Sequence, residues 1–261
     1  MLDFTWVTYK QLLTTLQNNH YVFYRFEDYC TQLATHEPFP TRWVILRHDV
    51  DRNASNALLM AQLETHMGIM GSYYFRAASD DNQRLVIQQI ADLGHEIGYH
   101  YEDLALCKGH VAKALIHFQE QLSYLRQFYP VRTICMHGSP CSAFDNKSLW
   151  ASHSYLTYGI IGEPYLSLNF EEVYYLTDTG RCWDGQKYSI RDKVNTSITS
   201  QYHTSQQVMC AATEGSLPNN MMLTIHPQRW TDNRLLWFCE WLLQSTKNQL
   251  KRVLNTSQHK L

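Results

Sequence analysis

The stretch WVILRHDVD occupies residues 43–51 and places a short apolar run directly before two carboxylates, Asp49 and Asp51. A short apolar run with β-branched side chains is typical of a buried strand. Carboxylates two residues apart repel each other unless a cation or a proton lies between them. We therefore expect a buried strand that ends in a metal-binding or acid–base pair. Capping of the next helix is the alternative role for these Asp side chains.

Outward from this strand, the sequence alternates between strand and helix patterns. One helix is predicted to begin at about Asn53, with Leu59, Met60, Leu63 and Met67 on one face. A second is predicted to begin after a cap at Asp80, and a third to span 110–129. A final helix is predicted around Leu235, Cys239 and Leu242. Further strands are predicted at 69–75, 96–99, 131–136, 155–161, 173–177 and 221–225. Such alternation gives a parallel sheet with right-handed crossovers. We expect one α/β domain, a closed or nearly closed seven-stranded barrel at 41–261, with an open doubly wound sheet as the alternative. Residues 1–40, with a helix near Thr8 to Gln17, are expected to pack on one end.

Composition excludes several classes of protein. The 261 residues include 22 Lys+Arg and 24 Asp+Glu, a net charge of −2 (22 − 24), which argues against nucleic acid as the partner. The apolar fraction of 44% is enough for a full core, so global disorder is excluded. No apolar run reaches membrane-spanning length, and the N-terminus carries no signal-peptide pattern. The 7 cysteines form no Cys-x-x-Cys pair, and we expect a reducing, cytoplasmic location.

Acidic and imidazole side chains follow most of the predicted strands. They are Asp49, Asp51, His100, His137, Asp178 and His226. In parallel α/β folds, the loops after the strand ends share one face, and that face holds the active site. We therefore expect these groups, distant in sequence, to gather around a single divalent cation.

Two local clusters suggest how such a cation is held. In GHEIGYHYED (94–103), His100 and Glu102 could offer a nitrogen and an oxygen to one zinc-like ion, whereas His95 is expected to be a satisfied core histidine. In MHGSP (136–140), His137 is a candidate ligand or substrate contact, or a turn residue bonded to backbone.

Two later clusters suggest substrate contact and proton transfer. TDTGRCWD (177–184) carries charges, a glycine turn and a Trp on which a sugar ring could stack, although ordinary packing is the alternative. LTIHP (223–227) puts His226 at a strand end, where we expect a general acid.

These clusters, in this order, resemble the polysaccharide deacetylase superfamily, also called NodB-homology proteins or carbohydrate esterase family four. The resemblance covers about residues 41–230. It is closest to a divergent branch carrying His-Asp-Val-Asp, found among bacterial surface-polysaccharide biosynthesis proteins. The resemblance implies a distorted (β/α)7 barrel and metal-dependent removal of an N- or O-acetyl group from a sugar.

The resemblance also implies roles for individual residues. Asp49 would be the catalytic base, and Asp51 and His100 would bind the metal. The family's second metal-binding histidine corresponds to Leu104, which cannot bind a metal. The third ligand is then Glu102, Asp103, His137 or the spare carboxylate, and Glu102 is favoured.

The remaining family motifs are matched in part. The third motif keeps Pro140 but has His137 near the position of the base-orienting Arg, and Cys141 where a Tyr is expected. Asp178 and Trp183 correspond to the Asp and Trp of the fourth motif, and His226 to the histidine of the last.

The sequence therefore predicts a hydrolase, with zinc as the favoured metal, that removes an acetyl group from a sugar or a surface-polysaccharide precursor, N-acetyl before O-acetyl. Asp49 would take the proton of the attacking water, and His226 would protonate the leaving amine. The expected substrate contacts are His48, His137, Asp178, Arg181 and Trp183. Two alternatives stay open: a glycan-binding pseudoenzyme on the same barrel, and a metal-dependent amidase or phosphoesterase acting on a small metabolite.

Overall fold

The computed structural model describes residues 2–76, 81–189, 191 and 193–258. Its core is a seven-stranded sheet in the order β5-β4-β3-β2-β7-β6, with β1 also paired to β2. Every strand pairing is parallel. Among the described residues β5 and β6 do not pair, so the sheet curls into an incompletely closed barrel. This confirms the predicted α/β barrel of parallel strands.

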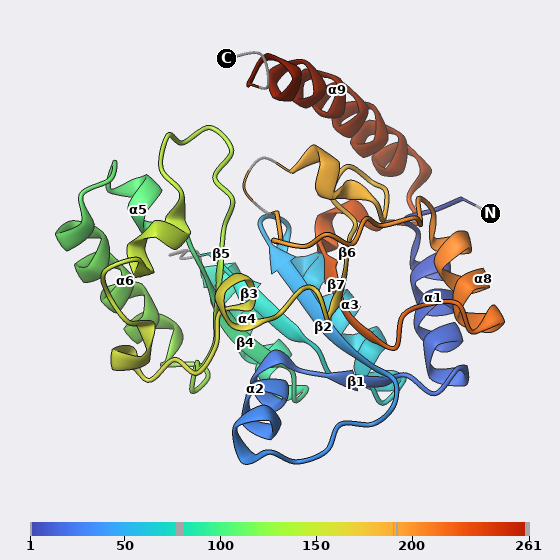
Figure 1. Ribbon diagram of the computed structural model, residues 1–261, viewed down its shortest axis with the longest axis horizontal. Helices are drawn as coiled ribbons and strands as arrows, with labels where there is room; N and C mark the ends of the chain where they lie inside the picture. Colours follow the sequence, from blue (N-terminus) through green and yellow to red (C-terminus); the bar gives the residue numbers. More distant parts are fainter. Residues whose placement is uncertain (1, 77–80, 190, 192, 259–261) are drawn as a thin grey trace.

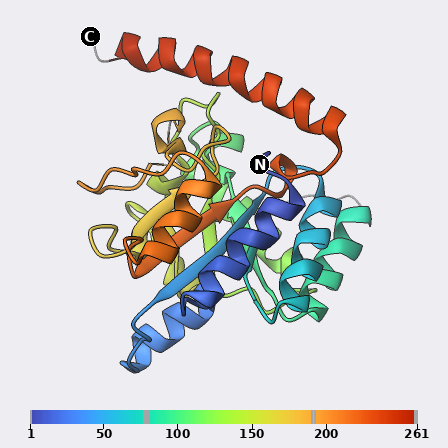
Figure 2. The same ribbon diagram turned by 90° about the vertical axis from the view of Figure 1, so that its right-hand side faces the viewer.

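The elements follow one another in regular alternation. In chain order the strands and α-helices are α1 (Trp6–Asn18), β1 (Val22–Tyr24), α2 (Phe26–Thr35), β2 (Trp43–Val50), α3 (Ala54–His66), β3 (Ser72–Phe75), α4 (Asp81–Asp92), β4 (Glu96–Tyr101), α5 (Asp103–Leu106), α6 (Val111–Leu125), β5 (Ile134–Met136), α7 (Pro164–Ser167), β6 (Tyr174–Thr177), α8 (Ser205–Glu214), β7 (Asn220–Ile225) and α9 (Arg234–Gln258). The predicted cap at Asp80 lies outside the described residues. Figures 1 and 2 show the helices wrapped around the outside of the curled sheet.

β2 is the organising strand of the sheet. All eight of its residues are buried, which confirms the buried strand predicted from the apolar run 43–46 and extends the burial to the polar residues that follow it. Because side chains alternate along a strand, Trp43 and Ile45 belong to the core cluster inside the curl, whereas Val44 and Leu46 pack in the layer beneath α1 and α8. Continuing this alternation puts 47 and 49 on the inner side and His48 on the outer side.

Two element predictions are wrong. Tyr155–Tyr158 forms a short 3-10 helix, not a strand, and the nearby Gly162 makes an isolated parallel bridge to Thr133. The seventh strand is instead β1, which pairs with the first half of β2 from Val22 to Tyr24. Residues 1–40 thus supply a strand of the sheet, and α1 packs against α8.

The apolar face of α3 also differs from the predicted one. The buried residues of this helix are Ala57, Met60, Ala61 and Glu64, whereas Leu59 is exposed. The small alanines let α3 lie close to the sheet, and Glu64 accepts hydrogen bonds there.

The last helix, α9, places polar side chains against the rest of the protein and apolar side chains toward solvent, the reverse of an ordinary amphipathic helix. Its side toward the body is mostly polar: Gln244 is buried, the Asn248 side chain donates to the carbonyl of Gly180, and Trp237 donates from Nε1 to the carbonyl of Asp3. Leu235 and Leu242, which the apolar pattern singles out, face solvent. Figure 2 shows this helix lying across the end of the molecule, apart from the sheet.

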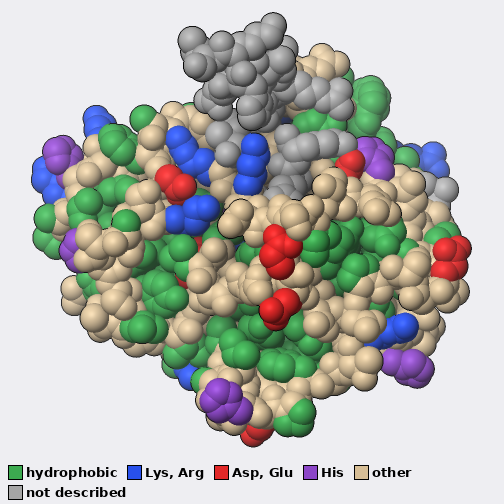
Figure 3. Space-filling model, in the orientation of Figure 1, with side chains coloured by type: hydrophobic (Ala, Val, Ile, Leu, Met, Phe, Trp, Pro, Cys, Tyr) green, Lys and Arg blue, Asp and Glu red, His purple; other side chains and the backbone are tan. Residues whose placement is uncertain are grey.

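Among the described residues, no helix has the length and apolarity required to cross a membrane. On the face that Figure 3 shows, Lys and Arg side chains are interspersed with Asp and Glu and separated by uncharged side chains. This distribution agrees with the near-zero net charge of the sequence.

Candidate active site

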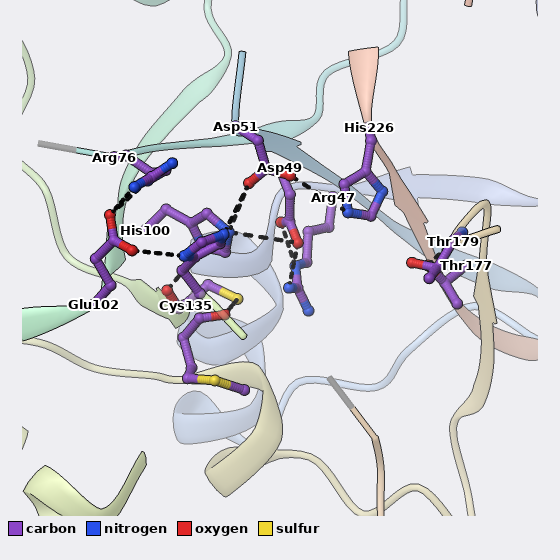
Figure 4. A network of polar contacts seen from close by, with 12 residues as sticks. Arg47, Asp49, Asp51, Arg76, His100, Glu102, Cys135, Thr177, Thr179 and His226 are labelled. Atoms are coloured by element: carbon purple, nitrogen blue, oxygen red, sulfur yellow. Dashed lines mark hydrogen bonds and ion pairs between the residues drawn. The ribbon is translucent and has the colours of Figure 1, made fainter. Parts of the chain in front are cut away.

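The predicted gathering of acidic and imidazole groups at the strand ends is found. Asp49 and Asp51 come from the end of β2, His100 from β4, and two further histidines directly follow β5 and β7. Figure 4 shows Asp49, Asp51, His100 and His226 pointing toward a common space. The Nε2 atom of His226 lies 4.0 Å from Oδ2 of Asp51, across this space.

Three of these groups form a compact set of metal-type donors. The Oδ1 atom of Asp51 is 3.5 Å from Nε2 of His100 and 3.7 Å from Nε2 of His137. Donors bound to one tetrahedral zinc ion are separated by roughly 3.3 Å, so small shifts would let all three reach one ion.

The surroundings of the three donors favour a metal. Oδ1 of Asp51 is buried and accepts no hydrogen bond. The Nδ1 atoms of His100 and His137 lie 3.0 Å from the carbonyl of Cys135 and 2.8 Å from a carboxylate oxygen of Glu102. These contacts fix both rings with Nε2 toward the shared space, which is how metal-binding histidines are usually oriented. The residues present therefore fit a divalent ion.

Glu102 is not placed where the sequence analysis expected it. Its carboxylate forms an ion pair with Arg76 and accepts hydrogen bonds from His137 and Ser139. Glu102 therefore orients the His137 ring through Nδ1, on the side away from Asp51. Burial would raise the pKa of Glu102, but His137 and Arg76 lower it to about 2. His137, predicted mainly as a substrate contact, takes the third donor position. Leu104 is buried in the apolar layer beneath α6.

Asp49 is held by an arginine that the sequence analysis did not single out. Arg47 donates from Nε and Nη2 to the two carboxylate oxygens at 2.8 and 2.7 Å, and its side chain is fully buried. Burial would raise the pKa of Asp49, but the guanidinium of Arg47 and the nearby His100 hold it below its usual range. Arg47 and Asp49 are two positions apart on one strand, so their side chains lie on the same face. This spacing is the sequence signal that could have predicted the pair.

The same charges act on His100. Burial would lower its pKa, but the carboxylates of Asp49 and Asp51 outweigh burial and raise it. The carboxylates of Asp49 and Asp51 thus give the site negative charge that a cation would balance.

His226 is oriented by Asp178, which differs from the predicted substrate role of that aspartate. Oδ1 of Asp178 lies 2.6 Å from Nδ1 of His226, and Oδ2 accepts from the His226 backbone and from Trp230. Asp178 is fully buried and also paired with Arg229, so it cannot reach a substrate. Its position fixes the His226 ring with Nε2 facing Asp51.

Three further residues predicted as substrate contacts are buried. His48 lies on the outer side of β2, fully buried, with Nε2 at 2.8 Å from Glu64. Trp183 is 1% exposed, and its Nε1 donates to Ser205, so packing is its role. Arg181 is buried against the rings of Phe4 and Trp237. His95, by contrast, is the core histidine that was predicted: it is fully buried and bonded to backbone groups of Gly71 and Ala61.

No family model matches the chain, and no curated protein matches it. Several solved structures are similar. One is the CE4 domain of a multidomain xylanase from the hindgut metagenome of Trinervitermes trinervoides, with 11% identity, TM-score 0.43, and coverage of 80% of this chain and 85% of that one. A CE4 family pseudoenzyme from Bacillus anthracis has 12% identity and TM-score 0.44 over 81% and 62% of the two chains. A family 4 carbohydrate esterase from Streptomyces lividans has 13% identity and TM-score 0.41 over 79% and 90%.

These three proteins are described as members of carbohydrate esterase family 4. At such low identity nothing about activity is carried over from them. The function proposed below rests on the side chains of this chain.

Proposed function

We propose that this protein is a metal-dependent hydrolase that removes an acetyl group, N-acetyl before O-acetyl, from a carbohydrate. One observation carries the proposal. A set of three metal-type donors, Asp51, His100 and His137, lies beside a carboxylate held by Arg47 and an imidazole held by Asp178. Hydrolysis of an amide needs a base for water, a stabilised oxyanion and an acid for the leaving group, and these positions supply all three.

Asp49 is suited to accept the proton of the attacking water. Its lowered pKa keeps it ionised at neutral pH, and the two hydrogen bonds from Arg47 fix its carboxylate plane. A divalent ion at Asp51, His100 and His137 would polarise the acetyl carbonyl and stabilise the developing negative charge. Zinc suits this set of one oxygen and two nitrogen donors.

His226 is suited to protonate the leaving nitrogen. Asp178 accepts a hydrogen bond from Nδ1–H, which leaves Nε2 as the atom that would exchange a proton with substrate. The His226 side chain is 11% exposed, and its Nε2 atom faces Asp51 across the shared space. An amine leaves poorly without such protonation, which is why this residue is assigned as the general acid.

Acetate release tests the proposal. Purified protein loaded with Zn²⁺ is incubated with N-acetylated and O-acetylated oligosaccharides, with and without a chelator. We expect chelator-sensitive release that Asp49→Asn abolishes and that Asp28→Asn, a change at an exposed ion pair on α2, leaves unchanged. Release that is indifferent to chelator or to Asp49→Asn would refute the mechanism. Sugar binding without turnover by the metal-loaded protein would assign it to glycan binding instead.

A further inference from the structure

A second group of metal-type donors lies outside the proposed active site, near α9. Cys182, Asp184 and His203 each offer one donor atom, and these atoms all lie within 4.8 Å of one another. Nδ1 of His203 is 2.8 Å from Oδ1 of Asp184. None of these residues takes part in the mechanism described above.

The backbone holds the three residues in register. Cys182 and Asp184 flank Trp183, whose ring is buried and bonded to Ser205 and whose backbone N–H donates to the carbonyl of His203 at 3.0 Å. Asp184 also bridges to Thr177 of β6. The donors are therefore brought together by main-chain contacts and a packed indole, so little ordering would remain when a ligand binds.

A cavity of about 190 Å³ opens beside this group. Cys182 and His203 line it on one side, and Gln244 and Asn248 of α9 line it on the other. Figure 1 shows α9 lying over the segment that follows β6. Arg181 also borders the cavity, but its guanidinium donates to the Arg229 carbonyl and stacks on Trp237.

We propose that Cys182, Asp184 and His203 form a second divalent-metal site, with zinc as the fitting ion. Sulfur, nitrogen and carboxylate oxygen are the three donor types that zinc combines, and water in the cavity would complete four-coordination. Binding would release the Cys182 thiol proton and replace the proton shared by Asp184 and His203. The ion would cross-link the two ends of the loop between residues 184 and 203 and stiffen the turn that begins at Asp178. This assignment does not depend on the proposed hydrolase activity.

Cobalt substitution tests the second site without an activity assay. Protein freed of metal by a chelator is titrated with Co²⁺ under reducing conditions, and the near-ultraviolet thiolate-to-cobalt charge-transfer band is recorded. The proposed active-site donors include no sulfur, so this band reports on Cys182. We expect the band in wild type and in Asp51→Asn, and its loss in Cys182→Ser and in His203→Ala. His203 is largely exposed, so its substitution should leave the fold intact, which circular dichroism checks.

Two further cysteines serve as controls. Cys210→Ser changes an exposed thiol on α8, and Cys135→Ser changes the buried thiol near Asp49 and His100. Both should keep the band. A band that is missing in wild type, persists in Cys182→Ser, or disappears in Cys135→Ser overturns the proposal. Zinc content after dialysis should be lower by one ion per chain in Cys182→Ser than in wild type, and an unchanged content would contradict the site.

Discussion

Replacing Arg47 by Met should destabilise the protein by about 3–5 kcal/mol, because it leaves the buried Asp49 carboxylate without its partner. The pair is held by two hydrogen bonds of 2.8 and 2.7 Å, with side-chain exposures of 0% and 6%. The Arg47 guanidinium also lies 4.9 Å from the ring centroid of Tyr165, an interaction worth roughly 1–2 kcal/mol when desolvated. Asp49→Asn should cost a similar amount, since it leaves a buried guanidinium unpaired.

The double variant tests whether the losses of stability in the two single variants come from the same Arg47–Asp49 interaction. Arg47→Met with Asp49→Asn leaves no unpaired buried charge, so its destabilisation should fall short of the sum of the single changes by about 2–3 kcal/mol. Urea unfolding in the presence of a chelator measures the four free energies of unfolding while excluding a contribution from bound metal.

A matched pair on α2 provides the control. Arg25 and Asp28 form two hydrogen bonds of 2.6 and 2.8 Å, but their side chains are 26% and 46% exposed. The same cycle there, Arg25→Met with Asp28→Asn, should give a coupling energy below about 1 kcal/mol. A coupling energy between Arg47 and Asp49 no larger than this would show that burial does not strengthen the pair. It would refute the conclusion that Arg47 stabilises and orients the Asp49 carboxylate.

Three further outcomes are expected. Asp178→Asn removes the carboxylate that fixes His226, so it should lower kcat for acetate release by about 100-fold or more with little change in KM; an unchanged kcat would show that His226 needs no such support. Glu102→Gln should weaken Zn²⁺ binding about 10- to 100-fold, measured by competition with a chromophoric chelator, because it loosens His137; equal affinity would place that histidine outside the metal site. Burial raises the pKa of Glu163 from 4.5 to about 7, so the folded state binds the extra proton and stability falls as pH rises through 7. The stability of Glu163→Gln relative to wild type should therefore increase by about 2.5 kcal/mol between pH 5 and pH 8, measured by urea unfolding at both pH values, and a constant difference would mean that this carboxyl titrates normally.

The sequence determined the fold class and the general location of the site. Residues 43–46 form an apolar run that is typical of a strand buried on both faces, and such strands occur mostly in parallel sheets with helices outside them. Once the strands are parallel, their carboxyl ends share one edge, so the gathering of Asp49, Asp51, His100 and His226 follows from local patterns alone.

Only the tertiary structure decided which side chain does what at that edge. Whether Glu102 or His137 faces Asp51 depends on how the ends of β4 and β5 meet, a contact that spacing along the chain does not specify. Trp183 looks exposed in a polar stretch, but Phe4, near the N-terminus, and Trp230, just before α9, pack against it. Local patterns report the surface that one segment must bury, whereas the identity of a metal ligand or a buried aromatic depends on segments that meet only after the chain has folded.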